Sequence, residues 1–270
     1  MTTSQKAFGV YRRVAAAQTK NQLIREIAQN GGAVTTLLVY SLENKIIDGA
    51  IVSTIDKKRP FYPTPKLATT SQEILESAGT RYTYSPNTQA LSEVTRQKRR
   101  AVAFVGTPCQ IRAIRKMQQA KLERVQPIKL LIGLMCSKTY TYKQLMIDHI
   151  QNKLGISLHS IKRIEIRNGM IIRQADAKET KIPLAAIEKY ARKSCRLCND
   201  FSSELADISA GSLGLHDWTL IIVRTQVGDQ IFNQAEKAQA FAVRSIREDE
   251  PAFKLLHRLA EVKHSRAENS

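Results

Sequence analysis

The fold class is decided by the stretch AVAFVGTPCQ at residues 101–110. Its first half, Ala101 to Val105, is an apolar run with the length of a buried strand, and a helical pattern follows from Gln110 to about Gln119. A strand, a glycine turn and a helix in this order are typical of α/β proteins, in which ligands bind at the carboxyl ends of strands. We therefore expect an α/β fold (mixed α+β) with its ligand site near Gly106.

The rest of the chain alternates helix and strand signals in the same way. A second apolar run, 128–134, ends before Cys136 as the first ends before Cys109. Asn168-Gly169 is the strongest short hairpin signal and lies within 161–172. The other expected elements are a strand-like start at 8–11, two helices separated by glycines over 21–42, a strand at 47–53, helices at 71–77, 88–98 and 142–154, a short helix from 184, a final strand at 218–224, and a peripheral helix after 247.

Composition excludes two broad classes of protein. The chain has 270 residues, and its 43% of hydrophobic residues is enough to fill a core, which argues against disorder. No stretch reaches the roughly 18 uninterrupted apolar residues of a membrane span. No apolar signal-peptide segment follows the first residues, so we expect a soluble, cytoplasmic protein.

The charge is strongly positive and unevenly distributed. Lys and Arg number 42 and Asp and Glu 24, which gives a net charge of +18. The segment from Arg96 to Lys138 holds eleven basic residues and one acid, Glu123. Such an excess favours an acidic partner, of which nucleic acid is the commonest. However, Phe104 is the only aromatic residue there, and base-stacking platforms need several. A solvated helical face is the alternative.

Two segments have the composition of ligand-binding loops. Gly31-Gly32 opens a helix, where backbone N–H groups can approach an anion closely, although two glycines alone are a weak signal. The loop at 78–87 is rich in hydroxyl groups and has no large aliphatic residue. Such a loop either lines a polar ligand or forms a turn stabilised by local hydrogen bonds.

The four cysteines form the most specific pattern in the chain. Cys195 and Cys198 form a Cys-x-x-Cys pair that can chelate one metal or cluster, whereas Cys109 and Cys136 each follow a predicted strand. If these strands are neighbours, both thiols lie at one sheet edge. Four thiolates hold either Zn²⁺ or a [4Fe–4S] cluster, and two single, widely separated ligands favour the cluster. The alternative is that Cys109 and Cys136 are ordinary buried thiols and that only the Cys-x-x-Cys pair matters.

Several motifs together resemble the beta subunit family of coenzyme F420 hydrogenases and dehydrogenases. They are QNGGAVT at 29–35, GTRYTYSPN at 79–87, FVGTPCQI at 104–111, GLMC at 133–136, CRLCND at 195–200 and ADISAG at 206–211. The match extends from about Phe8 to Gly228. The resemblance implies an iron–sulfur flavoprotein that contains FAD and exchanges hydride with coenzyme F420, a 5-deazaflavin.

The resemblance also implies roles for individual residues. Cys109, Cys136, Cys195 and Cys198 would ligate a [4Fe–4S] cluster. Hydride transfer would be mediated by the flavin, without a catalytic acid–base pair. The residues expected to bind cofactor are Gly31, Gly32, Ala33 and Thr35 at the pyrophosphate, Thr80, Tyr84, Ser85 and Asn87 along the flavin, Gly106, Thr107 and Pro108 between flavin and cluster, and Asp207 and Gly211 in a turn beside the flavin.

The family further suggests an organisation and a set of partners. We expect one flavoprotein body with an FAD- and F420-binding part at 1–87, a larger cluster-bearing part at 88–245 and a charged tail at 246–270. The chain lacks further cysteine runs, so we expect a partner redox subunit, such as a hydrogenase or a formate dehydrogenase, docked at an N-terminal helix or the tail. The basic segment would then face the anionic deazaflavin, not nucleic acid. The alternatives are a family member with another acceptor, a subunit that keeps the cluster without flavin, and a four-cysteine zinc protein that binds nucleic acid.

Overall fold

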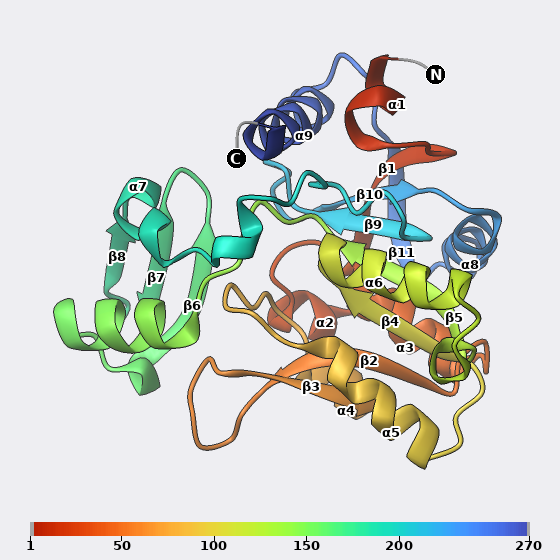
Figure 1. The fold of residues 1–270 in the computed structure, drawn as a ribbon, viewed down its shortest axis with the longest axis horizontal. Coiled ribbons are helices and arrows are strands. Elements are labelled where there is room, and N and C mark those ends of the chain that lie inside the picture. Colours follow the sequence, from red (N-terminus) through yellow and green to blue (C-terminus); the bar gives the residue numbers. More distant parts are fainter. Residues whose placement is uncertain (1–2, 269–270) are drawn as a thin grey trace.

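An eight-stranded mixed sheet forms the body of the molecule in the computed structural model, which describes residues 3–268 (Figure 1). The strand order is β11-β1-β10-β9-β5-β4-β2-β3. The four inner strands β9, β5, β4 and β2 are parallel, and the outer pairs are antiparallel. The strands are β1 Arg13–Thr19, β2 Gly49–Ile55, β3 Pro63–Ala68, β4 Val102–Gly106, β5 Ile128–Leu134, β9 Ile208–Gly211, β10 Thr219–Val223 and β11 Phe241–Ser245.

Both faces of this sheet are covered by helices, because its central strands are apolar on both sides. In β4, Ala103 and Val105 face one core, while Val102 and Phe104 face another. The first core includes residues of α3 (Ala33–Glu43) and α8 (Gln226–Lys237). The second includes residues of α5 (Leu91–Arg96) and α6 (Pro108–Gln119). A parallel sheet buried on both faces is the α/β arrangement that the sequence predicts.

The end of the sheet that holds β1 and β10 is covered by the two terminal helices. α1 (Thr3–Phe8) and α9 (Pro251–Glu268) pack together there, and the rings of Phe8 and Phe253 lie edge to face at 5.5 Å. The helix expected after residue 247 is therefore present, but it is part of the core and not peripheral. No helix within residues 3–268 is both long and apolar enough to cross a membrane.

A smaller lobe projects from one side of the body (Figure 1). It contains the antiparallel strands β6 (Ile161–Ile166), β7 (Met170–Gln174) and β8 (Glu179–Ile182), with a π-helix at Lys143–Lys153. These elements share a separate apolar core that includes Leu145, Ile150 and Ile172. The hairpin predicted at Asn168-Gly169 is confirmed by the pairing of β6 with β7.

Three expected elements differ from the structure. The strand-like start at 8–11 is wrong, since α1 ends at Phe8 and Gly9 has φ +82°, which stops the helix. The turn expected at 207–211 is instead the buried strand β9, between β5 and β10. The strand at 218–224 is not the last one, because β11 follows and pairs with β1. The remaining α-helices are α2 Gln22–Ile27, α4 Ser71–Glu76 and α7 Leu184–Ile187.

Candidate functional site

A cavity of about 340 Å³ opens at the carboxyl ends of the parallel strands. Its wall includes Val52 and Ser53 of β2, the end of β4, Leu134 of β5, and the end of β9. Pockets that bind small molecules measure roughly 300–1,000 Å³ and lie at this edge of parallel sheets. The strand, turn and helix at 101–110 therefore predicted both the fold and the edge at which the cavity lies.

The N-terminus of α3 lines one side of the cavity. Gly32 caps this helix in the left-handed conformation, with φ +71°, and Ala33, Val34 and Thr35 line the cavity beside it. The first N–H groups of a helix have no partner inside it and favour an anion. Gly31 does not line the cavity: a Cβ there would lie 2.5 Å from the backbone of Ala17, so packing against β1 explains this glycine.

The hydroxyl-rich loop lies against the turn that follows β4. Asn87 Nδ2 donates to Val105 O at 2.8 Å, and Ser85 Oγ donates to Asn87 Oδ1 at 2.6 Å. From the other side, Gln110 Nε2 donates to Ser85 O at 2.6 Å, and its Oε1 accepts from Thr107 N at 3.1 Å. These bonds fix the two halves of the cavity wall to each other.

Arg81 lines the cavity and was not predicted as a site residue. Its guanidinium donates to Ala78 O at 3.0 Å and Ser77 O at 3.4 Å. Burial lowers the pKa of Arg81 to about 10, and no carboxylate within residues 3–268 acts against that shift. Burial also lowers the pKa of Arg224 to about 10, but there the carboxylates of Asp200 and Glu204 oppose it. Arg81 is thus a cation at the cavity without a charged protein partner among residues 3–268.

The four cysteines approach one another next to the cavity. β4 and β5 are neighbours, which meets the condition for Cys109 and Cys136 to follow adjacent strand ends. Cys136 lies within electrostatic range of the other three thiols, and burial raises its pKa to about 12. Within residues 3–268, no three His, Cys, Asp or Glu side chains are close enough to ligate one metal ion. Four thiols that gather at one place are the donor set of either an iron–sulfur cluster or a zinc ion.

Three residues belong to the cavity wall and also adjoin the thiols. Thr107 lines the cavity, and its Oγ1 lies 3.3 Å from Cys109 Sγ. Thr139 also lines it, with its N at 3.5 Å and its Oγ1 at 3.7 Å from Cys195 Sγ. Met135 lines it and precedes Cys136. Single residues therefore separate the cavity from the thiols. Like Arg81, Thr139 is a residue of the site that the sequence motifs did not predict.

Most residues expected to bind cofactor lie together at this cavity. Those in its wall are Gly32, Ala33, Thr35, Thr80, Ser85, Asn87, Gly106, Thr107 and Gly211.

Four residues expected at the cofactor lie elsewhere. They are Gly31, described above, Tyr84, Pro108 and Asp207. The ring of Tyr84 stacks on the Arg192 guanidinium at 3.7 Å, and Pro108 is the first residue of α6. Asp207 is buried and accepts from Arg115 Nη2 at 2.7 Å and Leu131 N at 2.8 Å, so its bonds tie α6 and β5 to the start of β9.

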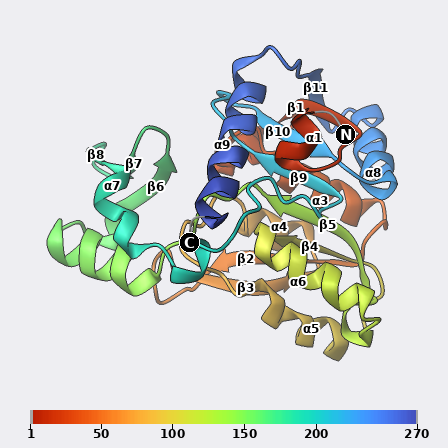
Figure 2. The ribbon, with the colours of Figure 1, turned by 45° about the horizontal axis from the view of Figure 1, so that its top comes forward.

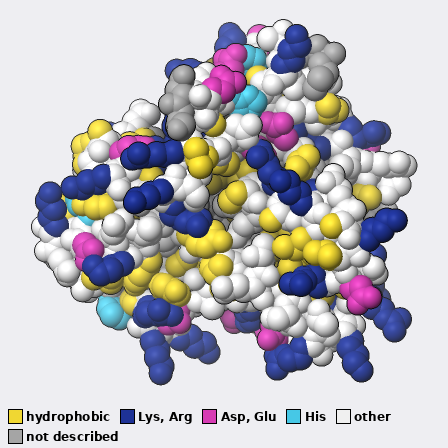
Figure 3. Space-filling view, viewed as in Figure 1, with side chains coloured by type: hydrophobic (Ala, Val, Ile, Leu, Met, Phe, Trp, Pro, Cys, Tyr) yellow, Lys and Arg dark blue, Asp and Glu magenta, His cyan; other side chains and the backbone are white. Residues whose placement is uncertain are grey.

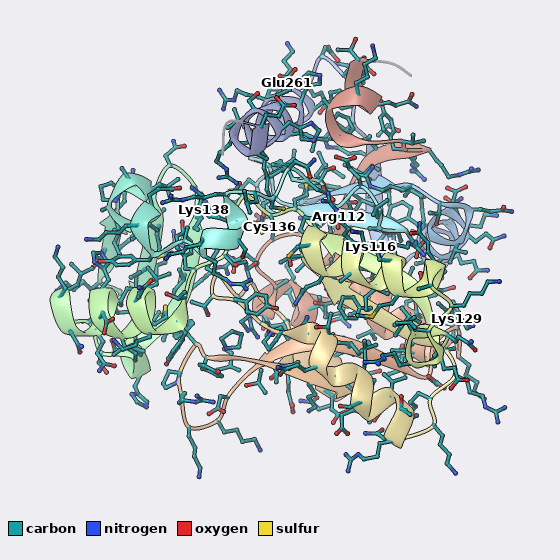
Figure 4. The ribbon with its side chains drawn as sticks, viewed as in Figure 1. Arg112, Lys116, Lys129, Cys136, Lys138 and Glu261 are labelled. Carbon is teal, nitrogen blue, oxygen red and sulfur yellow. The ribbon has the colours of Figure 1, made fainter. Side chains whose placement is uncertain are left out.

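The basic segment from Arg96 to Lys138 contributes none of its Lys or Arg side chains to the cavity wall. Figure 4 shows Arg112 and Lys116 on α6, and Lys129 at the opposite end of β5 from Cys136. Across the face in Figure 3, Lys and Arg side chains are scattered and do not gather at one place. Arg81 is the cation at the cavity wall, and it lies outside this segment.

Comparison with known sequences identifies the class of protein to which this fold and site belong. Two family models describe the coenzyme F420 hydrogenase/dehydrogenase beta subunit. The model of its N-terminal part matches residues 14–92, and the model of its C-terminal part matches residues 99–249. The chain belongs to this family of oxidoreductase subunits, as the motifs predicted.

Individual relatives match nearly the whole chain. Coenzyme F420 hydrogenase subunit beta of Methanothermobacter thermautotrophicus is 35% identical over 97% of this chain and 94% of its own length. The subunit of the same name from Methanosarcina barkeri is 37% identical over 93% and 87%. A chain in the solved F420-reducing [NiFe] hydrogenase complex of Methanosarcina barkeri superposes with a TM-score of 0.93, at 33% identity, over 97% of this chain and 92% of that one.

Proposed function

We propose that this chain is an iron–sulfur flavoprotein subunit that exchanges electrons between a partner redox subunit and coenzyme F420. The observation that carries the proposal is the adjacency of cavity and thiols. Thr107 and Thr139 each line the cavity and lie within 4 Å of a cysteine Sγ. A ligand in this cavity would be one side chain away from a cluster held by the four cysteines.

FAD is the cofactor that this cavity would hold. It supplies the link between the one-electron chemistry of an iron–sulfur cluster and the hydride that a deazaflavin accepts. The N-terminus of α3, with Gly32, Ala33 and Thr35, offers N–H groups to a pyrophosphate. Thr80, Ser85 and Asn87 place hydroxyl and amide groups in the same cavity wall. The residues present therefore fit the cofactor.

Coenzyme F420 is the substrate in this proposal. We assign the binding of anionic groups to Arg81. Arg81 is half-buried and has no carboxylate partner within residues 3–268, so an anionic ligand would offset the cost of its partial desolvation. FAD carries a pyrophosphate, and the deazaflavin carries a phosphodiester followed by glutamates. Arg81 can therefore neutralise a phosphate or carboxylate that approaches the cavity.

The partner subunit would exchange electrons on the side where the thiols approach the surface. Cys109 is exposed, and Leu197, between the two cysteines of the pair, has 69% of its surface exposed. In this proposal each part of the chain contributes a different feature. Residues 1–87 supply the glycine cradle and the hydroxyl-rich loop. Residues 88–245 supply the thiols, and residues 246–270 supply the last helix. We assign the subunit to the cytoplasm.

A zinc protein that binds nucleic acid is the weaker candidate. It needs four thiolates close enough for one ion, whereas no such group exists within residues 3–268. It also needs a concentrated basic surface, and the face in Figure 3 shows its Lys and Arg side chains scattered. A cavity at strand ends has no use in that function.

Absorption and metal analysis of the anaerobically purified chain test the proposal. We expect a flavin band in the blue, broad iron–sulfur absorption, and four irons per chain. Coenzyme F420 should then be reduced with electrons from a reduced viologen dye. A colourless protein with one zinc would overturn the proposal. Iron and sulfide without flavin, even after FAD is added, would leave a cluster-binding subunit that does not act on the deazaflavin.

A further inference from the structure

The last helix places basic side chains against the segments that carry the cysteines. α9 (Pro251–Glu268) lies beyond the two stretches that match the family models. Phe253, Leu256 and Ala260 bury it against the sheet. In Figure 2, α9 crosses the body and ends beside the turquoise segment that carries Cys195. Its last turns therefore have a fixed position relative to the thiols.

Lys263 is the buried cation of this helix. It lies three residues after Ala260, on the same helical face, and only 4% of its surface is exposed. Its Nζ donates to the backbone carbonyl of Cys136. None of the ion pairs within residues 3–268 includes Lys263, and its charge acts on the Cys136 thiol. The ammonium group therefore lies beside the backbone of a residue that would ligate the cluster.

Arg266 joins the two separate cysteine segments. It follows Lys263 by three residues, and its Nη2 donates to Ser137 O at 3.1 Å and to Cys195 O at 3.0 Å. One guanidinium therefore bonds to the chain next to Cys136 and to the chain at Cys195, which lie 59 residues apart in the sequence (195 − 136). Both bonds are made to backbone carbonyls, so they fix the path of the chain independently of the state of the thiols.

We propose that α9 clamps the cysteine segments and that the charge of Lys263 raises the reduction potential of the cluster. This inference rests on the proposed function. Reduction by one electron adds a negative charge to the cluster, and a fixed positive charge nearby stabilises the reduced form. The net charge and hydrogen bonding around a cluster are among the factors that set its potential. Lys263 and Arg266 are positioning residues in this scheme, since neither touches the substrate.

The test is a dye-mediated redox titration of the full chain, followed by electron paramagnetic resonance. Lys263→Met removes the charge and keeps the length of the side chain. We expect about a tenfold shift toward the oxidised form, which is ~59 mV more negative for a one-electron couple. Lys263→Arg keeps the charge and should stay close to wild type. Lys254→Met is the matched control, because Lys254 is an exposed lysine on the same helix.

The outcomes separate this inference from the proposed function. A wild-type chain without iron and sulfide overturns both. A loaded Lys263→Met variant with the wild-type potential, or one shifted no further than Lys254→Met, overturns only the role of α9. If Lys263→Met folds without iron while Lys263→Arg retains it, the charge is needed to hold the cluster, which supports the proposal. Loss of iron from both variants overturns the charge effect.

Discussion

The cavity and the cysteine centre adjoin each other, yet they are assembled in different ways. The cavity wall combines strand ends, such as Gly106 of β4, with the N-terminus of α3 and the loop at 78–87. The cysteine centre combines two strand ends, a loop near residue 195 and the last helix of the chain. The cavity therefore lies where an α/β sheet places its ligand sites, whereas the centre depends in addition on where the last helix packs.

Each region also contains a cation, the half-buried Arg81 in one and the buried Lys263 in the other, and the partners of the two cations differ. Arg81 bonds to carbonyls three and four residues away, Ala78 and Ser77. Lys263 bonds to a carbonyl 127 residues away, at Cys136. A ligand that enters from solvent can neutralise Arg81, whereas Lys263 is enclosed with the thiols. Variants that remove one group from each region should therefore separate substrate binding from cluster chemistry.

The largest effect should follow from removing one thiol. In Cys195→Ala, the cluster loses one of four ligands, so we expect loss of most iron and a fall of F420 reduction by about a thousandfold or more. Iron analysis and the viologen-linked assay measure both. Ser194→Ala is the control, because Ser194 is an exposed neighbour in the same loop. Unchanged iron in Cys195→Ala would refute the assignment of four thiolate ligands.

This difference between the regions also explains what the sequence could predict. The cavity edge followed from residues 101–110, because a strand and the turn after it are neighbours in the chain. The sequence left open whether the two strands before Cys109 and Cys136 are neighbours, and the pairing of β4 with β5 brings both cysteines to one edge. The contact of Lys263 with Cys136 was not predictable, since periodicity gives the face of a helix but not its position on the sheet. Arg81 was missed because a lone arginine in a loop shows neither its burial nor its partners.

The second prediction concerns the cradle of the cavity. Gly32 has φ +71°, and a Cβ there would lie 2.9 Å from Ile24 Cγ2. We expect Gly32→Ala to destabilise the fold by about 1–2 kcal/mol and to reduce FAD occupancy to a small fraction. Thermal unfolding and flavin content measure these two effects.

Gly155 provides the matched control for backbone strain. Its φ is +66°, and an added Cβ would meet no atom within 4 Å. Gly155→Ala should therefore lose about as much stability from strain as Gly32→Ala but keep its FAD. If Gly32→Ala retained full FAD occupancy, the role of the α3 N-terminus as a phosphate cradle would be wrong.

The third prediction concerns the positive charges that bind the anionic substrate. Arg81→Gln should raise the KM for coenzyme F420, or the Kd for FAD, about tenfold, since a hydrogen bond to a charged group contributes roughly 1.5–3 kcal/mol. Arg124→Gln removes an exposed charge from the basic segment and should change both constants less than twofold. Steady-state kinetics at two ionic strengths and FAD titration give the comparison. An equal effect of the two variants would assign substrate attraction to the overall charge.

The smallest effect should come from Thr139, which belongs to both regions. Thr139→Val keeps the shape of the side chain and the backbone N–H at 3.5 Å from Cys195 Sγ, but removes the hydroxyl at 3.7 Å. Hydrogen bonds to sulfur raise cluster potentials, so the potential should fall by an amount equal to a two- to threefold shift in the redox equilibrium. Iron content and FAD occupancy should stay at wild-type values. The control is Thr141→Val, whose hydroxyl bonds to Gln144 and not to a thiol. If both variants gave the same potential, the hydroxyl of Thr139 would serve the cavity wall alone, and the two regions would be coupled through the backbone.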